Sequence, residues 1–234
     1  VGFADGGVVQ LAPGSDRPQP LRFDQPPRSA ITRFHEGRSG ALWIGTYTSG
    51  LYRARPLSSV IRQDGAGVGD MRDWPSPSVR AVARDGARML VGTDAGLHLR
   101  DGAGPWRTIP ALATDSVRAL AADGAGGWWV GTLSGLYRLH RDDRIVPVAG
   151  LRDPRIDALL RQGDTLWVGT RGGLQRFERG QAVADPRVAA IDGSVVTRLY
   201  PDIDGSLLVG TSTRGLWRLR GDTFARLTPT GAGL

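Results

Sequence analysis

The sequence contains no cysteine, no lysine and no asparagine, and it holds only two glutamates, Glu36 and Glu178. Without cysteine the chain can form neither a disulfide nor a thiolate metal site. About half of the aspartates stand beside glycine, as in turns, and the sequence offers no evident pair of catalytic carboxylates of the kind that glycoside hydrolases need at a defined separation. No apolar run approaches the roughly 18 residues that span a bilayer. We therefore predict no transmembrane segment within this sequence.

The net charge is +7, and all 30 basic residues are arginines. Codon usage in a GC-rich genome is sufficient to explain this bias. The arginines are scattered, without the dense basic run or the interleaved aromatic residues that typify nucleic-acid-binding surfaces. We expect no nucleic-acid partner.

A glycine-threonine pair that follows a short apolar run recurs about every 40 residues, which is the spacing of a repeat protein. The pairs are Gly45-Thr46, Gly92-Thr93, Gly131-Thr132, Gly169-Thr170 and Gly210-Thr211. A further copy opens the chain at Val1-Gly2-Phe3, where Phe3 replaces the threonine. The repeats span approximately residues 1–29, 30–77, 78–115, 116–154, 155–193 and 194–234.

Each complete copy holds four short segments rich in β-branched and aromatic residues, separated by Gly, Asp or Pro turns. Four strands in about 40 residues, repeated, are typical of one propeller blade per repeat. We therefore predict an all-β fold, a β-propeller of four-stranded antiparallel blades with about six blades present, as one partial domain (1–234) of a seven-bladed propeller. The first copy lacks its first strand, so we expect the chain to be a fragment of a longer protein.

The constant residues of the repeat have expected structural roles. The apolar run should pack between blades, and the glycine after it should allow close backbone approach or a special turn. The threonine hydroxyl should tie down the turn that follows.

The repeat resembles the two-component regulator propeller repeat. The matching pieces in one copy are Ser116–Leu120, the turn Asp123-Gly124, the centre Trp129–Thr132 and the return Gly135–Arg138, and they recur over nearly the whole chain. The departures from the pattern are Phe3 and a second copy lengthened around Gly65 to Pro77.

The resemblance implies a periplasmic sensor region of a bacterial inner-membrane signalling protein, because the family usually carries two seven-bladed propellers, a β-sandwich, a transmembrane helix and a cytoplasmic output. That output is commonly a histidine kinase, often a hybrid kinase, or a diguanylate cyclase. Known members sense oligosaccharides. By analogy, the partners would be a small-molecule or oligosaccharide ligand, the chain's own downstream transmembrane and output domains, and a second copy in a homodimer.

The candidate ligand-binding residues lie on the first strand of each blade, which lines the central channel of a propeller. The position just after the first apolar residue varies between copies, whereas the apolar positions stay constant, so it is free to serve a ligand. Arginine forks at and beside it suit carboxylate or hydroxyl-rich ligands. The predicted site residues are Thr32, Arg33, Arg80, Arg118, Asp157, Thr197 and Arg198.

The sequence predicts no catalytic residue, no metal site and no cofactor. His35, His98 and His140 are isolated in the sequence and are interpreted as surface residues, and Asp202–Gly205 lacks the rest of a calcium loop. We therefore expect this segment not to be an enzyme. Two alternatives stay open: a propeller enzyme, either a lyase or a glycoside hydrolase, and a protein-interaction scaffold.

Overall fold

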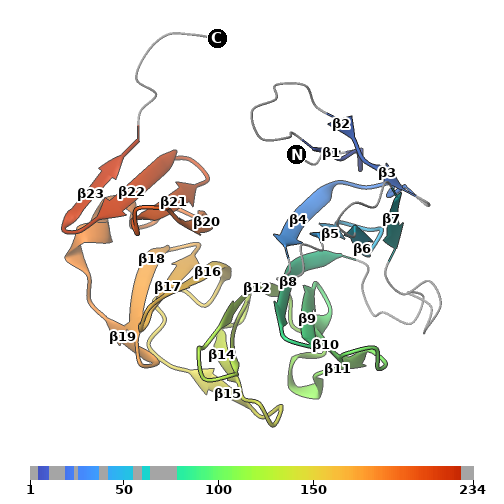
Figure 1. Ribbon diagram of the computed structural model, residues 1–234. Coiled ribbons are helices and arrows are strands. Elements are labelled where there is room, and N and C mark those ends of the chain that lie inside the picture. Colours follow the sequence, from blue (N-terminus) through green and yellow to red (C-terminus); the bar gives the residue numbers. More distant parts are fainter. Residues whose placement is uncertain are drawn as a thin grey trace. The chain divides into compact units, whose positions relative to one another are not determined.

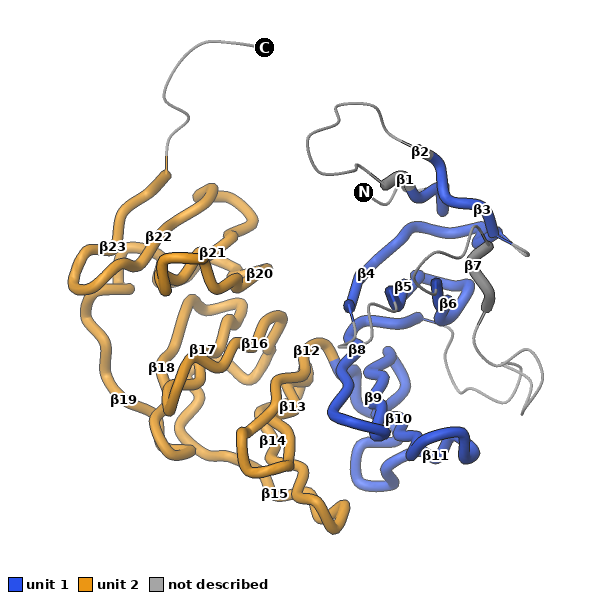
Figure 2. The backbone as a smooth tube through the Cα atoms, in the orientation of Figure 1, with its two compact units in different colours: residues 1–117 blue, residues 118–234 orange. Residues whose placement is uncertain are grey.

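The computed structural model describes residues 5–10, 19–23, 26–36, 42–54, 60–63 and 78–227. These residues form β-strands joined by turns and by short 3-10 helices, which confirms the all-β prediction. Two compact units, residues 1–117 and 118–234, divide the chain (Figure 2). Among the described residues, none belongs to a helix long and apolar enough to cross a membrane.

Unit 1 contains two blades, each built on four consecutive antiparallel strands (Figure 1). The first blade consists of β4 (Ile31–Glu36), β5 (Leu42–Thr46), β6 (Leu51–Ala54) and β7 (Val60–Gln63). The second consists of β8 (Val79–Asp85), β9 (Arg88–Thr93), β10 (Gly96–Asp101) and β11 (Arg107–Thr108), followed by the 3-10 helix η2 (Pro110–Leu112).

Unit 2 contains three further blades with the same strand order; the first strand of the first, β12, begins one residue before the unit boundary. The first of these blades consists of β12 (Val117–Ala122), β13 (Trp128–Thr132), β14 (Leu136–Leu139) and β15 (Ile145–Val148). The next consists of β16 (Ile156–Gln162), β17 (Thr165–Thr170), β18 (Gly173–Glu178) and β19 (Gln181–Val183), with the 3-10 helix η3 (Pro186–Ile191) after it. The last consists of β20 (Val196–Pro201), β21 (Leu207–Thr211), β22 (Leu216–Arg220) and β23 (Thr223–Arg226).

The number of blades differs from the prediction. The described residues build five blades, so about six blades of a seven-bladed propeller was wrong. The described residues of the first copy, residues 1–29, form the two-residue strands β1 (Val9–Gln10), β2 (Gln19–Pro20) and β3 (Arg22–Phe23). β1 and β2 pair with each other, and β3 adds in parallel to the edge strand β7 of the first blade.

The physical reason lies in how the described strands of that copy pair. β1 and β2 form a two-stranded sheet of their own and β3 joins the sheet of the first blade, so the described residues of this copy do not build a separate four-stranded sheet. Val1, Gly2 and Phe3 themselves lie outside the described residues, as do the lengthened segment Gly65 to Pro77 and the chain end at Leu234.

The central glycine of each repeat provides the close contact between one blade and the next. In unit 2, a Cβ atom added at Gly169 would lie 2.6 Å from Cγ1 of Val196, the first residue of the next blade's first strand. The same close approach joins Gly131 to Ile156, and in unit 1 it joins Gly45 to Val79 and Gly92 to Val117. All four of these β-branched residues are completely buried. The glycine is therefore needed for close backbone approach.

In the last described blade, the central glycine is Gly210, and no β-branched residue of another blade packs against it among the described residues. The nearest atom to a Cβ at Gly210 is the Cβ of Arg198 in its own sheet, at 3.4 Å. Leu216 on this blade is 43% exposed, whereas its counterparts Leu51, Leu97, Leu136 and Leu174 are at most 1% exposed. Among the described residues, the face beside Gly210 is left uncovered.

The repeat threonine closes the turn between the second and third strands, as the sequence predicts. The Thr170 hydroxyl donates to the carbonyl oxygen of Gly173 at 2.9 Å and accepts from the backbone N–H of Gly172 at 3.1 Å. Equivalent bonds to the glycine carbonyl form at Thr46, Thr93, Thr132 and Thr211.

His98 is buried in the core of the second blade, so the interpretation of it as a surface histidine was wrong. It is only 2% exposed, and its ring nitrogens lie 3.1 Å from Thr93 Oγ1 and 3.0 Å from Thr108 Oγ1. Burial lowers the pKa of His98 to about 4. The ring is therefore a neutral core residue at neutral pH. His35 and His140 are both partly exposed.

The substitution Gly169→Ala should destabilise the fold by about 1–3 kcal/mol, because the new methyl group overlaps Val196. The matched control is Gly210→Ala, at the same position of a blade with no such neighbour, and we expect it to change stability by no more than about 0.5 kcal/mol. Urea denaturation of the two variants measures the difference. Equal destabilisation by both would refute the role assigned to the glycine.

Replacement of His98 should change how stability depends on pH. Its folded pKa, about 4, lies below the ordinary 6.5, so the unfolded chain binds a proton that the folded chain excludes between these values. Stability should therefore fall as the pH drops from 6.5 towards 4, by at most about 1.4 kcal/mol per pH unit for this group. His98→Gln, with the side chain that Gln175 places at the equivalent position, should remove this contribution. Parallel pH profiles for the two proteins would contradict the assignment.

Candidate functional site

The predicted ligand-binding positions coincide with a β-bulge in the first strand of the blade. In the second blade, Val79 pairs with Thr93 and Ala81 pairs with Gly92, which leaves Arg80 as the extra residue. The register shifts in the same way around Thr32, Asp157 and Thr197. A bulge leaves its extra residue out of the ladder and re-aims the side chain. Four of the predicted ligand-binding residues therefore stand at the extra position of a bulge, where the side chain does not follow the regular alternation of the strand.

The residue directly after the Gly-Thr pair lies beside this bulge. Its backbone N–H donates to the carbonyl oxygen of the residue just before the first strand in four blades. The donor–acceptor pairs are Tyr47 to Ala30, Asp94 to Ser78, Arg171 to Arg155 and Ser212 to Val195. Sequence reasoning missed this second row of residues. Its signal is variation immediately after a constant pair: Tyr47, Asp94, Leu133, Arg171 and Ser212.

The bulge residues form the first row, and the residues after the Gly-Thr pairs form the second. In unit 1, residues of the two rows form a polar cluster. Arg80 binds Asp94 through both sides of its fork, with Nε–Oδ1 at 2.9 Å and Nη2–Oδ2 at 2.6 Å. The Ser116 hydroxyl donates to Asp94 Oδ1 at 2.9 Å. The guanidinium also lies 4.7 Å from the centroid of the Tyr47 ring, which is 48% exposed. Arg80 is thus positioned by an aromatic face and a carboxylate together.

The charge of Asp94 is stabilised by these contacts. Burial raises the pKa of Asp94, but hydrogen bonds from Arg80, Ser78 and Ser116 outweigh burial and lower it to about 2. The Arg80–Asp94 pair is therefore fully ionised at neutral pH.

The other predicted residues of unit 1, Thr32 and Arg33, form hydrogen bonds to the backbone. The Thr32 hydroxyl donates to the carbonyl oxygen of Val79 at 2.6 Å and so links β4 to β8. Arg33 Nη1 donates to the Thr32 carbonyl oxygen at 3.0 Å. Thr32 consequently has a structural role of its own.

In unit 2 the two rows meet at Asp157. Arg118 Nε and Nη2 lie 3.2 and 3.1 Å from Asp157 Oδ1, and Arg171 Nε lies 3.5 Å from Oδ2. The Asp157 side chain is 12% exposed, whereas Arg171 is 40% exposed. The structure thus brings two predicted residues, Arg118 and Asp157, into contact and adds Arg171 to them.

Thr197 and Arg198 stand at the bulge of β20, and within unit 2 this strand packs beside β16 (Figure 1). The Thr197 hydroxyl donates to the carbonyl oxygen of Gly210 at 3.2 Å, and Arg198 Nη1 donates to the Thr197 carbonyl oxygen. Desolvation lowers the pKa of Arg198, the negative charge of Asp157 raises it, and the positive charge of Arg118 lowers it. Arg198 therefore belongs to the same electrostatic cluster.

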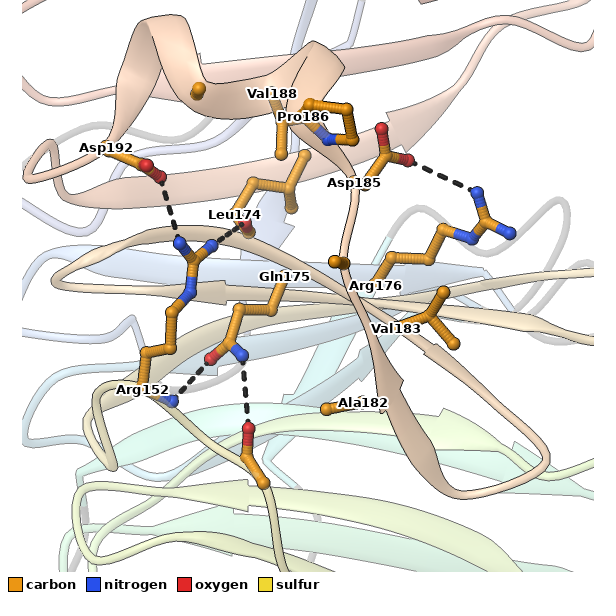
Figure 3. A pocket seen from close by; sticks show the side chains of 13 residues that line it. Arg152, Leu174, Gln175, Arg176, Ala182, Val183, Asp185, Pro186, Val188 and Asp192 are labelled. Atoms are coloured by element: carbon orange, nitrogen blue, oxygen red, sulfur yellow. Dashed lines mark hydrogen bonds and ion pairs between the residues drawn. The ribbon is translucent and has the colours of Figure 1, made fainter.

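Unit 2 also contains a pocket of about 550 Å³ between β18, β19, η3 and the segment before β16 (Figure 3). Gln175 accepts from the Arg152 backbone N–H at 2.8 Å and donates to the Gly150 carbonyl oxygen at 3.2 Å. Arg152 reaches across to Asp192, at 3.5 Å. The apolar part of the lining includes Leu174 and Val188. Sequence reasoning missed this pocket because its lining comes from three separate segments.

The described residues contain no group of three or more His, Asp or Glu side chains placed to hold a metal ion. The rows at the bulges can instead offer paired guanidinium and carboxylate groups to a ligand. Which of the predicted residues contact a ligand stays a prediction.

No protein-family model and no curated protein matches the chain. Solved structures share its fold. The extracellular domain of BT4673 from B. thetaiotaomicron, a protein described as a one-component or a hybrid two-component system, has a TM-score of 0.60 at 17% identity over 95% of this chain and 39% of that chain. The chain thus spans about two fifths of that domain's length.

Two propellers of other classes are similar to the chain in fold. The WD40 β-propeller domain of Doa1 has a TM-score of 0.68 at 11% identity, over 97% of this chain and 74% of that one. Virginiamycin B lyase from Staphylococcus aureus has a TM-score of 0.65 at 12% identity, over 86% and 71% of the two chains. Identities this low establish the fold alone, so the chain is shown to be similar to β-propellers.

Proposed function

We propose that this chain is a ligand-binding part of the extracytoplasmic sensor of a bacterial transmembrane signalling protein. The observation that carries the proposal is the pair of residue rows at the bulges. Arg80 with Asp94, and Arg118 with Asp157 and Arg171, place charged side chains at variable positions on a constant scaffold. The resemblance of the repeat supports a sensor over other classes of propeller, and the fold is compatible with a sensor, because the extracellular domain of BT4673 shares it.

In this proposal the ligand is a small molecule or an oligosaccharide. Arginine forks offer several N–H donors in one plane, and the aspartates offer acceptors. A sugar hydroxyl can therefore accept a hydrogen bond from an arginine and donate one to an aspartate. The exposed Tyr47 ring beside Arg80 adds an apolar surface of the kind on which a sugar can stack.

The output would be a cytoplasmic histidine kinase, often a hybrid kinase, or a diguanylate cyclase, and the chain would lie in the periplasm as part of an inner-membrane protein. Its partners would be its own downstream transmembrane and output domains and a second copy of the protein. A ligand can drive such a relay only if it binds one arrangement of the protein more tightly than the other. A homodimer that reorients when ligand binds would meet this condition.

An oligosaccharide panel tests ligand binding directly. A bound member should raise the melting temperature of the chain, and Arg80→Ala and Arg118→Ala should each weaken its binding in calorimetric titration by about tenfold or more, because charge-assisted hydrogen bonds are lost. The matched control is Arg107→Ala, which removes an arginine paired with Asp101 on β10, away from the first strands. Unchanged affinity in both test variants would place binding elsewhere, with the Gln175 pocket as the next candidate. Cleavage of the bound sugar would favour a propeller enzyme instead.

The coding sequence after Leu234 tests the signalling half of the proposal. Further repeats followed by a transmembrane helix and a kinase or cyclase would support it. A gene that ends with the propeller and encodes no membrane segment would contradict it.

A further inference from the structure

The bulge clusters of the two units differ in charge balance. In unit 1, Arg80 and Asp94 form a bidentate pair, one arginine to one carboxylate. In unit 2, Asp157 receives two arginines, Arg118 at 3.1 Å and Arg171 at 3.5 Å. The carboxylate of Asp157 therefore neutralises only part of the positive charge around it.

Arg198 increases this imbalance. It stands on β20, which packs beside β16, the strand of Asp157, and the charges of Asp157 and Arg118 both act on it. Its guanidinium donates to the Thr197 carbonyl oxygen, and no described residue places a carboxylate oxygen within ion-pair distance of it. The Thr197 carbonyl carries no net charge, so the positive charge of Arg198 is not neutralised by a direct partner.

The neighbouring charges do not correct the balance. Arg155 forms a bidentate pair with Asp153, at 2.9 and 2.7 Å, which uses that carboxylate. Counted over these described residues of unit 2 alone, the cluster contains four arginines (Arg118, Arg155, Arg171 and Arg198) and two aspartates (Asp153 and Asp157).

The arginine groups are accessible while the central carboxylate is recessed. The side chains of Arg118 and Arg171 are 23% and 40% exposed, and that of Asp157 is 12% exposed. An incoming ligand therefore meets guanidinium groups first and a single acceptor between them. An anion is attracted by the guanidinium groups and repelled, more weakly, by the single carboxylate of Asp157. A hydroxyl group can donate to Asp157.

We propose that the unit 2 cluster binds a sugar that carries a carboxylate beside its hydroxyl groups, a uronic acid unit of an oligosaccharide. The carboxylate lies against Arg118, Arg171 and Arg198, and a neighbouring hydroxyl donates to Asp157. This inference rests on the proposed ligand-binding function and specifies the class of ligand for one part of the site.

Arg198 is the residue of choice for the test, because its removal leaves no carboxylate without a partner. Isothermal titration of the 234-residue chain would use trisaccharides of galacturonic, glucuronic and mannuronic acid, their neutral counterparts and inorganic phosphate. At least one acidic trisaccharide should bind more tightly than its neutral counterpart. Arg198→Gln should weaken that binding by about 10- to 100-fold, the usual effect of losing a hydrogen bond to a charged group.

Two controls accompany the titration. Arg107→Gln removes the same charge from β11 of unit 1 and should leave the affinity for the acidic sugar unchanged. The melting temperature of each variant should stay close to that of the parent chain, which separates a loss of binding from a loss of fold. Arg171→Gln should weaken the same acidic sugar and provides a second variant if Arg198→Gln fails to fold.

The outcomes separate this inference from the proposal on which it rests. A neutral sugar that binds as tightly as its acidic counterpart, and is insensitive to Arg198→Gln, would overturn the carboxylate assignment and leave the sensor proposal standing. Phosphate that binds as tightly as the acidic sugar and is lost in the same variants would reduce the cluster to a general anion site, which also overturns the inference. If no sugar of the wider panel binds, the proposed function itself fails.

Discussion

The contact on which the rest of the structure depends is the approach of each blade to the central glycine of the blade before it. At Gly45, Gly92, Gly131 and Gly169, the first β-branched residue of the next blade occupies the space that a side chain would need. Such a contact tolerates almost no change of volume, because core side chains already pack at crystal-like density. It fixes where each first strand begins, and therefore where everything attached to that strand lies.

The position of the candidate site follows from this contact. In the second blade, Val79 is held against Gly45, and the ladder of the same strand resumes at Ala81 opposite Gly92. Arg80 lies between two fixed points and cannot join the ladder. The threonine bond to the turn glycine, and the backbone bond from the residue after that threonine, hold the second row beside the first. Stability thus rests on the constant residues, and the bulge and the position after the threonine can vary in chemistry at little cost to the fold.

Much of the blade was predictable from the sequence, for identifiable reasons. The alternating segments and their glycine turns specify four strands, and the glycine and threonine act as their recurrence suggests. The blade count was not predictable, because the first copy keeps the repeat pattern in sequence, yet its described residues form the short strands β1, β2 and β3 and no four-stranded blade. The bulge could not be predicted either, because neither Arg80 nor Asp157 is itself a glycine or a proline or stands next to one. Only the pairing register of the strands shows the extra residue. His98 occupies a position that is Tyr52 in one copy and Gln175 in another, so its burial had no simple signal.

The two bulge threonines show that the bulge alone does not make a residue available to a ligand. Thr32 uses its hydroxyl on the Val79 carbonyl and Thr197 uses its hydroxyl on the Gly210 carbonyl, and both bonds hold strands together. At the other two register-defined bulges the side chain is charged, and it contacts a partner from the second row, Asp94 for Arg80 and Arg171 for Asp157. Specificity in such a repeat would therefore depend on how the two rows are combined in each blade. A single arginine–aspartate pair in unit 1 and an aspartate between two arginines in unit 2 can then arise on the same scaffold.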